Sequence, residues 1–424
     1  MVGEEIKSNS TLIKKLAINF SSLSLLQLSN YIFPLIVFPY LVRVLGPEKY
    51  GLVNFAFAFT VYFSTVIDYG FALSATREIA VEKTNSDKIK EIFNSTLFSK
   101  IILLIPSTVI YFGIVLSISL FNRDIPLYAI VYIAILGSVL FPNWFFMGIE
   151  KMQFIAIFNI IFRLLSVIAI FLLVTESDDV IIYAAINSSY QLLLGIAGLY
   201  FVIVSGYTKV VYPGIKSIID RMKKGFSIFS SSFAIMLYTT SNTFILGLLA
   251  GNTSVGIFTG ADKLRLAYQS LGNIAGQTVY PSLSSLMKNS KSVGLRFLKK
   301  YSLIFGTIIL LFSSLVFSFS DLIVEIVLGS EFSSAGLVLK ILAFLPFIIF
   351  LSNIVGIQIM LNLGYDKEFN RVILIAALIN IALLFILVPT LAEIGTAISM
   401  LTTEVFVTTT MLIFISKRKL LNAV

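Results

Sequence analysis

The stretch QFIAIFNIIFRLLSVIAIFLLV, residues 153–174, is almost entirely apolar and carries one charged side chain, Arg163. A helix needs about 20 mostly apolar residues to cross the hydrocarbon core of a bilayer. The stretch is therefore predicted to be a transmembrane helix. A chain that contains such a helix is expected to be an integral membrane protein.

The composition of the whole chain agrees with this reading. Of its 424 residues, 58% are hydrophobic and only 12% are charged. A soluble domain is about 45–50% apolar and about 25% charged. The composition therefore argues against a soluble enzyme, a nucleic-acid-binding domain and a disordered chain. It favours an all-α integral membrane protein, and at roughly 30–35 residues per span the chain has room for about twelve to fourteen helices.

The chain contains no cysteine and no histidine. Their absence excludes disulfides, metal sites built from thiolate or imidazole, cysteine nucleophiles and Ser-His-Asp triads. No catalytic residue and no metal ligand is therefore predicted, and no cofactor.

Twelve apolar segments are found along the chain, and each is predicted to be one transmembrane helix. The polar start MVGEEIKSNSTLIKK argues against a cleaved signal peptide. The predicted spans are 17–43, 51–73, 95–120, 126–147, 153–174, 180–204, 226–250, 254–284, 301–328, 334–361, 370–390 and 393–416.

The basic residues indicate the orientation of these spans. Basic residues near the end of a span are counted with the adjoining segment. If the N-terminus is cytoplasmic, 24 of the 31 Lys and Arg residues, Lys100 among them, then belong to inner segments, 3 to outer segments and 4 to spans. Cytoplasmic loops are enriched in Lys and Arg. We therefore expect a multi-pass protein with both termini in the cytoplasm.

The longest cytoplasmic connection, about 205–225, lies at the middle of the chain. Ile215, Ile218, Ile219 and Met222 recur in it at helical spacing among basic residues. This pattern predicts an amphipathic helix on the inner leaflet, a tether between two halves, or both. The predicted parts are an N-terminal six-helix bundle (1–205), the linker (206–225) and a C-terminal six-helix bundle (226–424).

A short repeat supports two related halves. The joint LGPEKYGLVNFA (45–56) aligns with AGNTSVGIFTGA (250–261), and Gly46 and Gly51 match Gly251 and Gly256 at a constant offset. Halves of six spans each keep the same orientation in the membrane. We therefore expect the two bundles to surround a central cavity, as in transporters built from repeats.

Ionisable residues inside a span are costly unless paired or hydrated, so each is a candidate for function. In 254–284, Asp262, Arg265, Gln269 and Asn273 share one helix face, and Lys263 is adjacent. The face is interpreted as the wall of a hydrated cavity whose cations attract an anion. The alternative is an internal ion pair that fixes helix packing.

Further polar groups lie in other spans. For Arg77 and the neighbouring Glu78, the alternative is snorkelling of the side chain to the interface. For the uncharged groups, the alternative is close helix packing. The remaining candidates for the cavity or for ion coupling are Asp68, Arg163, Glu404, Asn30 and Asn242.

Three stretches carry a family resemblance. FPYLVRVLGPEKYGLVNFAFAFTVYFSTVIDYGFALSATREIA (38–80), FPNWFFMGIEKMQFIAIFNIIFR (141–163) and GIFTGADKLRLAYQSLGNIAGQTVYPSL (256–283) resemble the Wzx-type O-antigen and polysaccharide repeat-unit flippases. These proteins belong to the multidrug/oligosaccharidyl-lipid/polysaccharide exporter superfamily.

The resemblance implies two six-helix bundles around a cavity and a substrate of oligosaccharide linked to undecaprenyl pyrophosphate. The substrate would be flipped across the bacterial inner membrane by alternating access. Membrane lipids, a polysaccharide polymerase and a chain-length regulator would be its partners, and nucleic acid would not. The pyrophosphate would suit Arg265, Lys263, Arg163 and Arg77, and the sugars would suit the Asn and Gln groups.

No Walker A sequence is present, so an ion gradient is the expected energy source. Asp68, Asp262 and Glu404 are candidate H⁺ or Na⁺ sites. A drug/cation antiporter of the same superfamily is the nearest alternative, although it would favour an acidic cavity. A membrane-embedded glycosyltransferase or polymerase is less favoured, because no loop is large enough to hold a catalytic domain.

Overall fold

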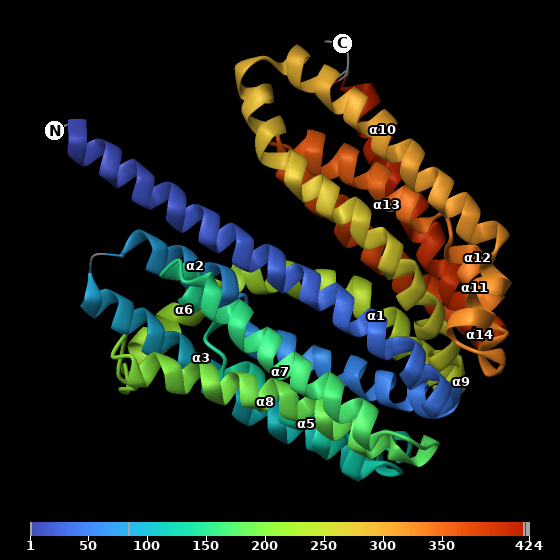
Figure 1. Ribbon diagram of the computed structural model, residues 1–424. Coiled ribbons are helices and arrows are strands. Elements are labelled where there is room, and N and C mark those ends of the chain that lie inside the picture. Colours follow the sequence, from blue (N-terminus) through green and yellow to red (C-terminus); the bar gives the residue numbers. More distant parts are fainter. Residues whose placement is uncertain (1, 84, 419, 421–424) are drawn as a thin grey trace. The chain divides into compact units, whose positions relative to one another are not determined.

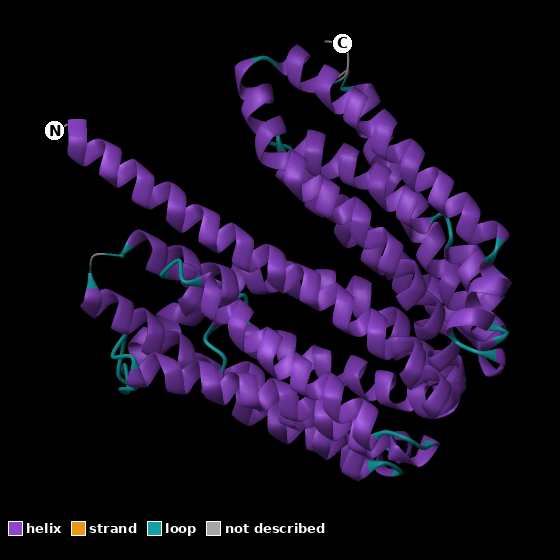
Figure 2. Ribbon diagram, viewed as in Figure 1, coloured by secondary structure: helices purple, strands orange, loops and turns teal. Residues whose placement is uncertain are grey.

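The computed structural model describes residues 2–83, 85–418 and 420. Within this part of the chain every regular element is a helix and no strand is present, as Figure 2 shows. At some helical positions, Asn30 and Asn273 among them, only the backbone is described. The prediction of an all-α fold is confirmed.

Nine helical stretches of the described residues are long and apolar enough to cross a membrane. Three of them are interrupted by a residue with non-helical backbone angles, so the predicted number of twelve stays a prediction. The stretches are Leu25–Val81, Ser86–Ser117, Ile125–Gly148, Met152–Leu173, Ser177–Val204, Thr239–Ser270, Lys291–Ser318, Ala335–Leu361 and Asp366–Lys417.

The chain divides into two compact units. Unit 1 comprises Met1–Val44 and Ala56–Phe233, and unit 2 comprises Leu45–Phe55 and Ala234–Val424. Residues 226–233 of the chain, directly after the predicted linker, therefore pack within unit 1, and the joint at residues 45–55 packs within unit 2. The predicted ranges of the bundles stay a prediction.

Unit 1 is built from the first eight helices and the start of the ninth (Figure 1). In it α5 and α8 lie side by side, because Gly137 and Gly195 have no side chains to separate their backbones. The helices are α1 (Val2–Asp68), α2 (Phe71–Val81), α3 (Ser86–Ser117), α4 (Ser119–Asn122), α5 (Ile125–Leu140), α6 (Asn143–Gly148), α7 (Met152–Leu173), α8 (Val180–Val204) and α9 (Ile215–Asn289).

Unit 2 contains most of α9 and the helices that follow it. One of them, Ile354–Leu361, is a π-helix. The others are α10 (Lys291–Ser318), α11 (Ser320–Val327), α12 (Ala335–Leu342), α13 (Leu345–Asn353) and α14 (Asp366–Lys417). Short 3₁₀ turns at Ser177–Asp179 in unit 1 and Ser330–Phe332 in unit 2 complete the elements.

Two of the longest helices contain a glycine joint. α1 has 67 residues and α9 has 75, whereas about 20 suffice to cross the hydrocarbon. Their backbones leave the helical region at Gly46 (φ 67°, ψ 172°) and at Gly251 (φ 82°, ψ −179°). A positive φ is readily adopted only by glycine. The same conformation at both positions agrees with the repeat that the sequence predicts.

The two joints also touch each other within unit 2. A Cβ atom on Gly51 would lie 1.8 Å from the carbonyl oxygen of Asn252, and one on Gly256 would lie 1.9 Å from that of Pro47. Gly51 and Gly256 therefore each face the backbone of the other joint. The second glycine of the G-x₄-G pattern is required by this close approach rather than by its backbone angles.

α14 contains a third joint, which has no glycine. Ala392 adopts φ 48° and ψ −124° within a helix of 52 residues. It lies between the predicted spans 370–390 and 393–416. The hydropathy pattern therefore located this break, which follows Pro389 by three residues.

The side of the membrane on which Lys100 lies stays a prediction. Lys100 itself lies inside α3, and its side chain is 3% exposed. Its Nζ atom is 2.5 Å from Oδ1 of Asp68 and donates a hydrogen bond of 3.1 Å to the carbonyl of Ser138. It also lies 4.9 Å from the centre of the Trp144 ring. Asp68, a residue predicted to bind the coupling ion, therefore has a fixed cationic partner.

The predicted linker contains the start of α9, at Ile215, and its contact with the inner leaflet stays a prediction. Ile215 and Ile219 are exposed, while Ile218 and Arg221 are buried. Asn94 of α3 holds the chain before α9, since its side chain donates to the carbonyl of Lys209 and accepts from the N–H of Val211. The linker is therefore attached to unit 1, with one of its basic residues inside.

The glycine contact predicts a selective loss of stability. Gly256→Ala should lower the Tm of the purified protein, because its Cβ would overlap the backbone at Pro47 and overpacking costs about 1–3 kcal/mol or more. Gly113→Ala is the matched control, since nothing lies within 4 Å of its Cβ position. Equal Tm values for the two variants would contradict the close contact.

The Asp68–Lys100 pair predicts an asymmetric effect. Asp68→Asn leaves the buried ammonium of Lys100 unpaired and should destabilise the protein by about 3–5 kcal/mol. Lys100→Met should cost less, because the side chain of Asp68 is 52% exposed and keeps part of its hydration. Thermal unfolding of both variants measures the difference. A larger loss of stability for Lys100→Met would contradict this prediction, because leaving Asp68 unpaired would then cost more than leaving Lys100 unpaired.

Candidate functional site

The polar face of α9 forms a connected cluster in unit 2. Arg265 is 2% exposed, and its Nε atom donates a hydrogen bond of 2.7 Å to Oδ1 of Asp262. A second donor of its guanidinium reaches Oε1 of Gln269. The i, i+3 spacing predicted the ion pair. The contacts hold the guanidinium along its own helix and leave some of its five donors for other partners.

Lys263 lies on the same helix near this cluster. Its Nζ atom is 5.2 Å from the centre of the Tyr50 ring, which is a distance typical of a cation–π contact. Tyr50 is completely buried and lies in the joint of α1 that belongs to unit 2. Lys263, close to the Gly251 joint of α9, therefore contacts Tyr50 in the Gly46 joint of α1.

Two other predicted residues of unit 2 are buried. Asn242 of α9 is 3% exposed and Glu404 of α14 is 8% exposed, so both side chains are in the interior. The side chain of Asn273 lies outside the described residues. In unit 1 the same holds for Asn30. The roles of these four residues stay predictions.

Arg163 lies between α7 and α8 in unit 1. Its guanidinium is 5.0 Å from the centre of the Tyr190 ring, whose hydroxyl donates a 2.7 Å hydrogen bond to Asn159. The Nε atom of Arg163 is buried and has no hydrogen-bond partner among the described residues. Its predicted contact with substrate stays a prediction, and the structure shows a packing contact between two helices.

Arg77 lines a cavity of about 470 Å³ in unit 1. The walls come from the end of α2, the start of α3 and the start of α9. Four basic and three acidic side chains line it. The lining residues are Ser74, Arg77, Glu78, Val81, Glu82, Lys88, Glu91, Ile92, Arg221, Lys224 and Ile228.

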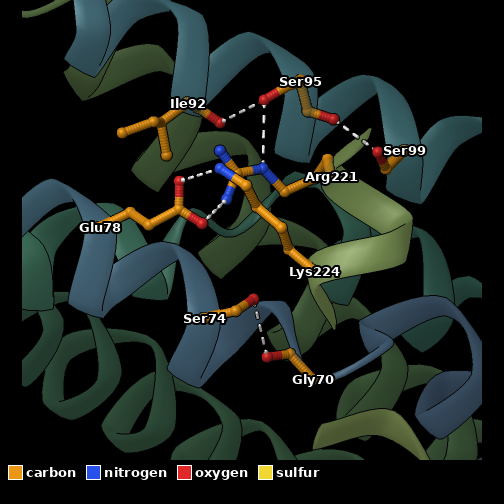
Figure 3. Close-up of polar contacts among 8 residues, drawn as sticks. All are labelled: Gly70, Ser74, Glu78, Ile92, Ser95, Ser99, Arg221 and Lys224. Carbon is orange, nitrogen blue, oxygen red and sulfur yellow. Dashed lines mark hydrogen bonds and ion pairs between the residues drawn. The ribbon is translucent and has the colours of Figure 1, made fainter. Parts of the chain in front are cut away.

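One carboxylate organises the wall of this cavity, as Figure 3 shows. Glu78 Oε1 accepts a hydrogen bond of 2.8 Å from Arg221, and its Oε2 accepts one of 3.2 Å from Lys224. Arg221 is 5% exposed, and its Nε atom donates to the hydroxyl of Ser95 at 3.3 Å. The hydroxyl of Ser95 donates in turn to the carbonyl of Ile92. Glu78 therefore links α2 to α9, and Arg221 extends the link to α3.

The basic groups at the rim of the cavity are more open. Lys88 forms a 3.0 Å ion pair with Glu91, and this hydrogen bond raises the pKa of the Lys88 ammonium above its usual value. Lys224 is 60% exposed although it contacts Glu78. The Lys88 ammonium therefore stays charged at neutral pH, and both side chains keep donors that face water.

Sequence reasoning found Arg77 but missed the residues around it. Glu78 was considered only as an interfacial neighbour of Arg77, and Arg221 and Lys224 only as part of the linker. The contact between Arg221 and Glu78 joins positions 143 residues apart in the chain. The signal available in the sequence was a segment with four carboxylates among its charged residues, 77–91, and a basic segment, 216–224.

Comparison with known proteins identifies the relatives of this chain. A family described as polysaccharide biosynthesis protein matches residues 16–287. A protein of Escherichia coli (strain K12) named "Putative O-antigen transporter" is 37% identical over 407 residues, which cover 95% of this chain and 97% of the relative. A protein of the same name from Shigella dysenteriae is 33% identical over 396 residues, with 93% and 98% covered.

Solved structures share the fold at low sequence identity. A lipid II flippase, MurJ, in an inward closed conformation has a TM-score of 0.67 at 16% identity and covers 97% of this chain and 90% of its own. An inward-facing multidrug resistance MATE transporter of the MOP superfamily has a TM-score of 0.64 at 14% identity, with 92% and 95% covered. The likeness confirms the integral membrane class of the fold.

The resemblance predicted from the sequence motifs is confirmed by these matches. The family match covers more than half of the chain, and both relatives exceed 30% identity over nearly all of it. The chain belongs to the polysaccharide biosynthesis protein family of multi-pass membrane proteins.

Proposed function

We propose that this protein flips oligosaccharides linked to undecaprenyl pyrophosphate from the cytoplasmic to the periplasmic leaflet of a bacterial inner membrane. The translocated repeat units would serve O-antigen or related polysaccharide biosynthesis. The identity of 37% over 95% of the chain to the Escherichia coli protein named "Putative O-antigen transporter" carries the proposal. The protein would act as a transporter and not as an enzyme, with both termini in the cytoplasm.

The buried charges provide physical support for an anionic substrate. A charged side chain within a membrane is costly, and such residues usually serve a pathway for a polar or ionic substrate. Arg265 is buried in unit 2, and Lys263 lies near it. A guanidinium that is always charged and has several donors suits a phosphate oxygen. The proposal therefore assigns the pyrophosphate to Arg265 and Lys263, with Gln269 beside them for sugar hydroxyls.

The movement of the substrate would follow alternating access. The two compact units would change their relation so that the head group is reached first from the cytoplasm and then from the periplasm. H⁺ or Na⁺ would supply energy through Asp68, Asp262 or Glu404. Asp68 and Asp262 each have a cationic partner, so an ion that binds there would compete with Lys100 or Arg265.

A drug/cation antiporter is the second candidate, because the fold is shared with multidrug transporters of the MATE family. That likeness is at 14% identity, whereas the O-antigen transporter relatives reach 33% and 37%. Transport of a lipid-linked anion is therefore favoured. A polysaccharide polymerase and a chain-length regulator are the proposed protein partners of the pathway.

A flipping assay tests the proposal. Wild-type protein in proteoliposomes should move a fluorescent oligosaccharide linked to undecaprenyl pyrophosphate across the bilayer. Arg265→Ala should lower the rate at least tenfold, which corresponds to about 1.4 kcal/mol, because the anion loses its anchor. Arg123→Ala, which changes an exposed residue after α4, is the control and should leave the rate unchanged.

Two outcomes would count against the assignment. A folded Arg265→Ala variant that flips at the wild-type rate would exclude Arg265 as the anion anchor. Recovery of the rate in the double variant Asp262→Asn/Arg265→Ala would show that Arg265 serves only to neutralise Asp262. Wild-type protein that moves cationic drugs and no lipid-linked sugar would favour the antiporter.

A further inference from the structure

The cavity at the ends of α2 and α3 carries features that the proposed translocation does not explain. Leu73, Arg77 and Val81 recur every four residues and share one face of α2. Leu73 is 62% exposed and Val81 is 77% exposed, and Arg77 between them is also exposed. The face therefore presents a cation between two apolar side chains. Such a stripe matches the boundary between lipid tails and head groups.

Some of the charged groups around the cavity form ion pairs, and Arg77 forms none with the described residues. Glu78 neutralises part of the charge of Arg221 and Lys224, and Glu91 pairs with Lys88. The guanidinium of Arg77 forms no ion pair or hydrogen bond within the described part of the chain. Glu82 is the remaining acidic group of the lining. Four cations against three carboxylates leave a formal surplus of one positive charge at the cavity.

Glu78 shows how an anion is held in this place. Its two oxygens each accept from a different basic side chain, one buried and one exposed. A phosphate group has more acceptor oxygens than a carboxylate and could accept from Lys224, Arg77 and Lys88 while Glu78 keeps the buried Arg221. Hydrogen bonds between charged donors and phosphate are among the strong ones in proteins. The wall therefore suits a phosphate without leaving Arg221 unpaired.

The apolar surroundings define what the phosphate is attached to. Val81 and Ile228 line the cavity itself, and Leu73 and Phe226 are exposed on the adjacent helices. A free phosphate would gain nothing from these side chains, whereas a hydrocarbon chain would cover them. The charge distribution of the sequence also predicts that this end of α2 faces the cytoplasm.

We propose that this cavity is a binding site for the phosphate or pyrophosphate of a membrane lipid at the cytoplasmic leaflet. Two sources share this chemistry. One is an anionic phospholipid, which would occupy the site whatever the protein transports. The other is the undecaprenyl pyrophosphate of the substrate, and this source rests on the proposed function. In both cases Arg77, Lys88 and Lys224 supply the donors.

A binding measurement on the purified full-length protein tests the site. The probes are undecaprenyl pyrophosphate, phosphatidylglycerol, phosphatidylcholine and inorganic pyrophosphate, titrated in detergent and followed by thermophoresis. The double variant Arg77→Gln/Lys224→Gln should weaken binding of the preferred anionic lipid at least tenfold. The matched control is Lys90→Gln, which removes an exposed ammonium of α3 that does not line the cavity.

The probes separate the sources of the lipid. Preference for undecaprenyl pyrophosphate over phosphatidylglycerol would support a substrate site, and equal or stronger binding of phosphatidylglycerol would support a phospholipid site. Wild-type affinity of the double variant for both lipids would overturn the proposal. Binding of inorganic pyrophosphate as tight as that of the lipids would overturn the lipid part of it, because the apolar rim would then contribute nothing.

The flipping assay keeps this inference separate from the proposed function. Wild-type protein that binds the lipids through Arg77 and Lys224 but flips no substrate would refute the function and leave the site. Active wild-type protein whose double variant binds normally would refute the site and leave the function. Both substituted residues are exposed, so the fold should survive, and an unchanged Tm verifies this.

Discussion

The constraint on which the rest of the structure depends is that hydrocarbon offers no partner to a backbone N–H or C=O group. A segment that crosses a membrane must satisfy these groups itself, and a helix does so within one segment. The described part of the chain accordingly contains helices and short connections, with no strand. At three places one helical stretch follows another without a loop between them. At Gly46, Gly251 and Ala392 the chain leaves helical geometry for a single residue.

The same constraint governs the charged residues. An ammonium or guanidinium within a bundle keeps its charge only if an anion or a set of acceptors replaces water. Lys100 is held by Asp68 and a carbonyl, Arg265 by Asp262 and Gln269, and Arg221 by Glu78 and Ser95. In each case a nearly buried cation is paired with a carboxylate that is more exposed. The exposed partner is the one that an ion or a substrate from water can reach. These pairs are therefore structural contacts, and in the proposed mechanism binding of an ion or a substrate would compete with them.

Much of the molecule can be predicted from its sequence. Hydropathy located helices on both sides of every joint, including Ala392, because each residue's preference for hydrocarbon is a local property. The match between Gly46 and Gly251 predicted equivalent joints, and the family motifs predicted the relatives that the comparisons found. The spacing of Asp262 and Arg265 predicted their ion pair, since residues three apart on a helix are neighbours. Each of these signals lies within a short window of sequence.

The sequence by itself determined the membrane class, the helical content, the repeated joint and the family. The tertiary structure alone decided which charges meet. The sequence count placed Lys100 with a cytoplasmic segment, and the structure shows it buried beside Asp68 and Trp144. The sequence placed Arg221 in the linker, and the structure shows it paired with Glu78. The structure also explains the second glycine of each joint, because Gly51 and Gly256 lie against the backbone of the other joint, where a side chain would not fit. The reason is physical: an ion pair or a backbone contact depends on distances between residues far apart in the chain, and no local pattern of polarity contains those distances.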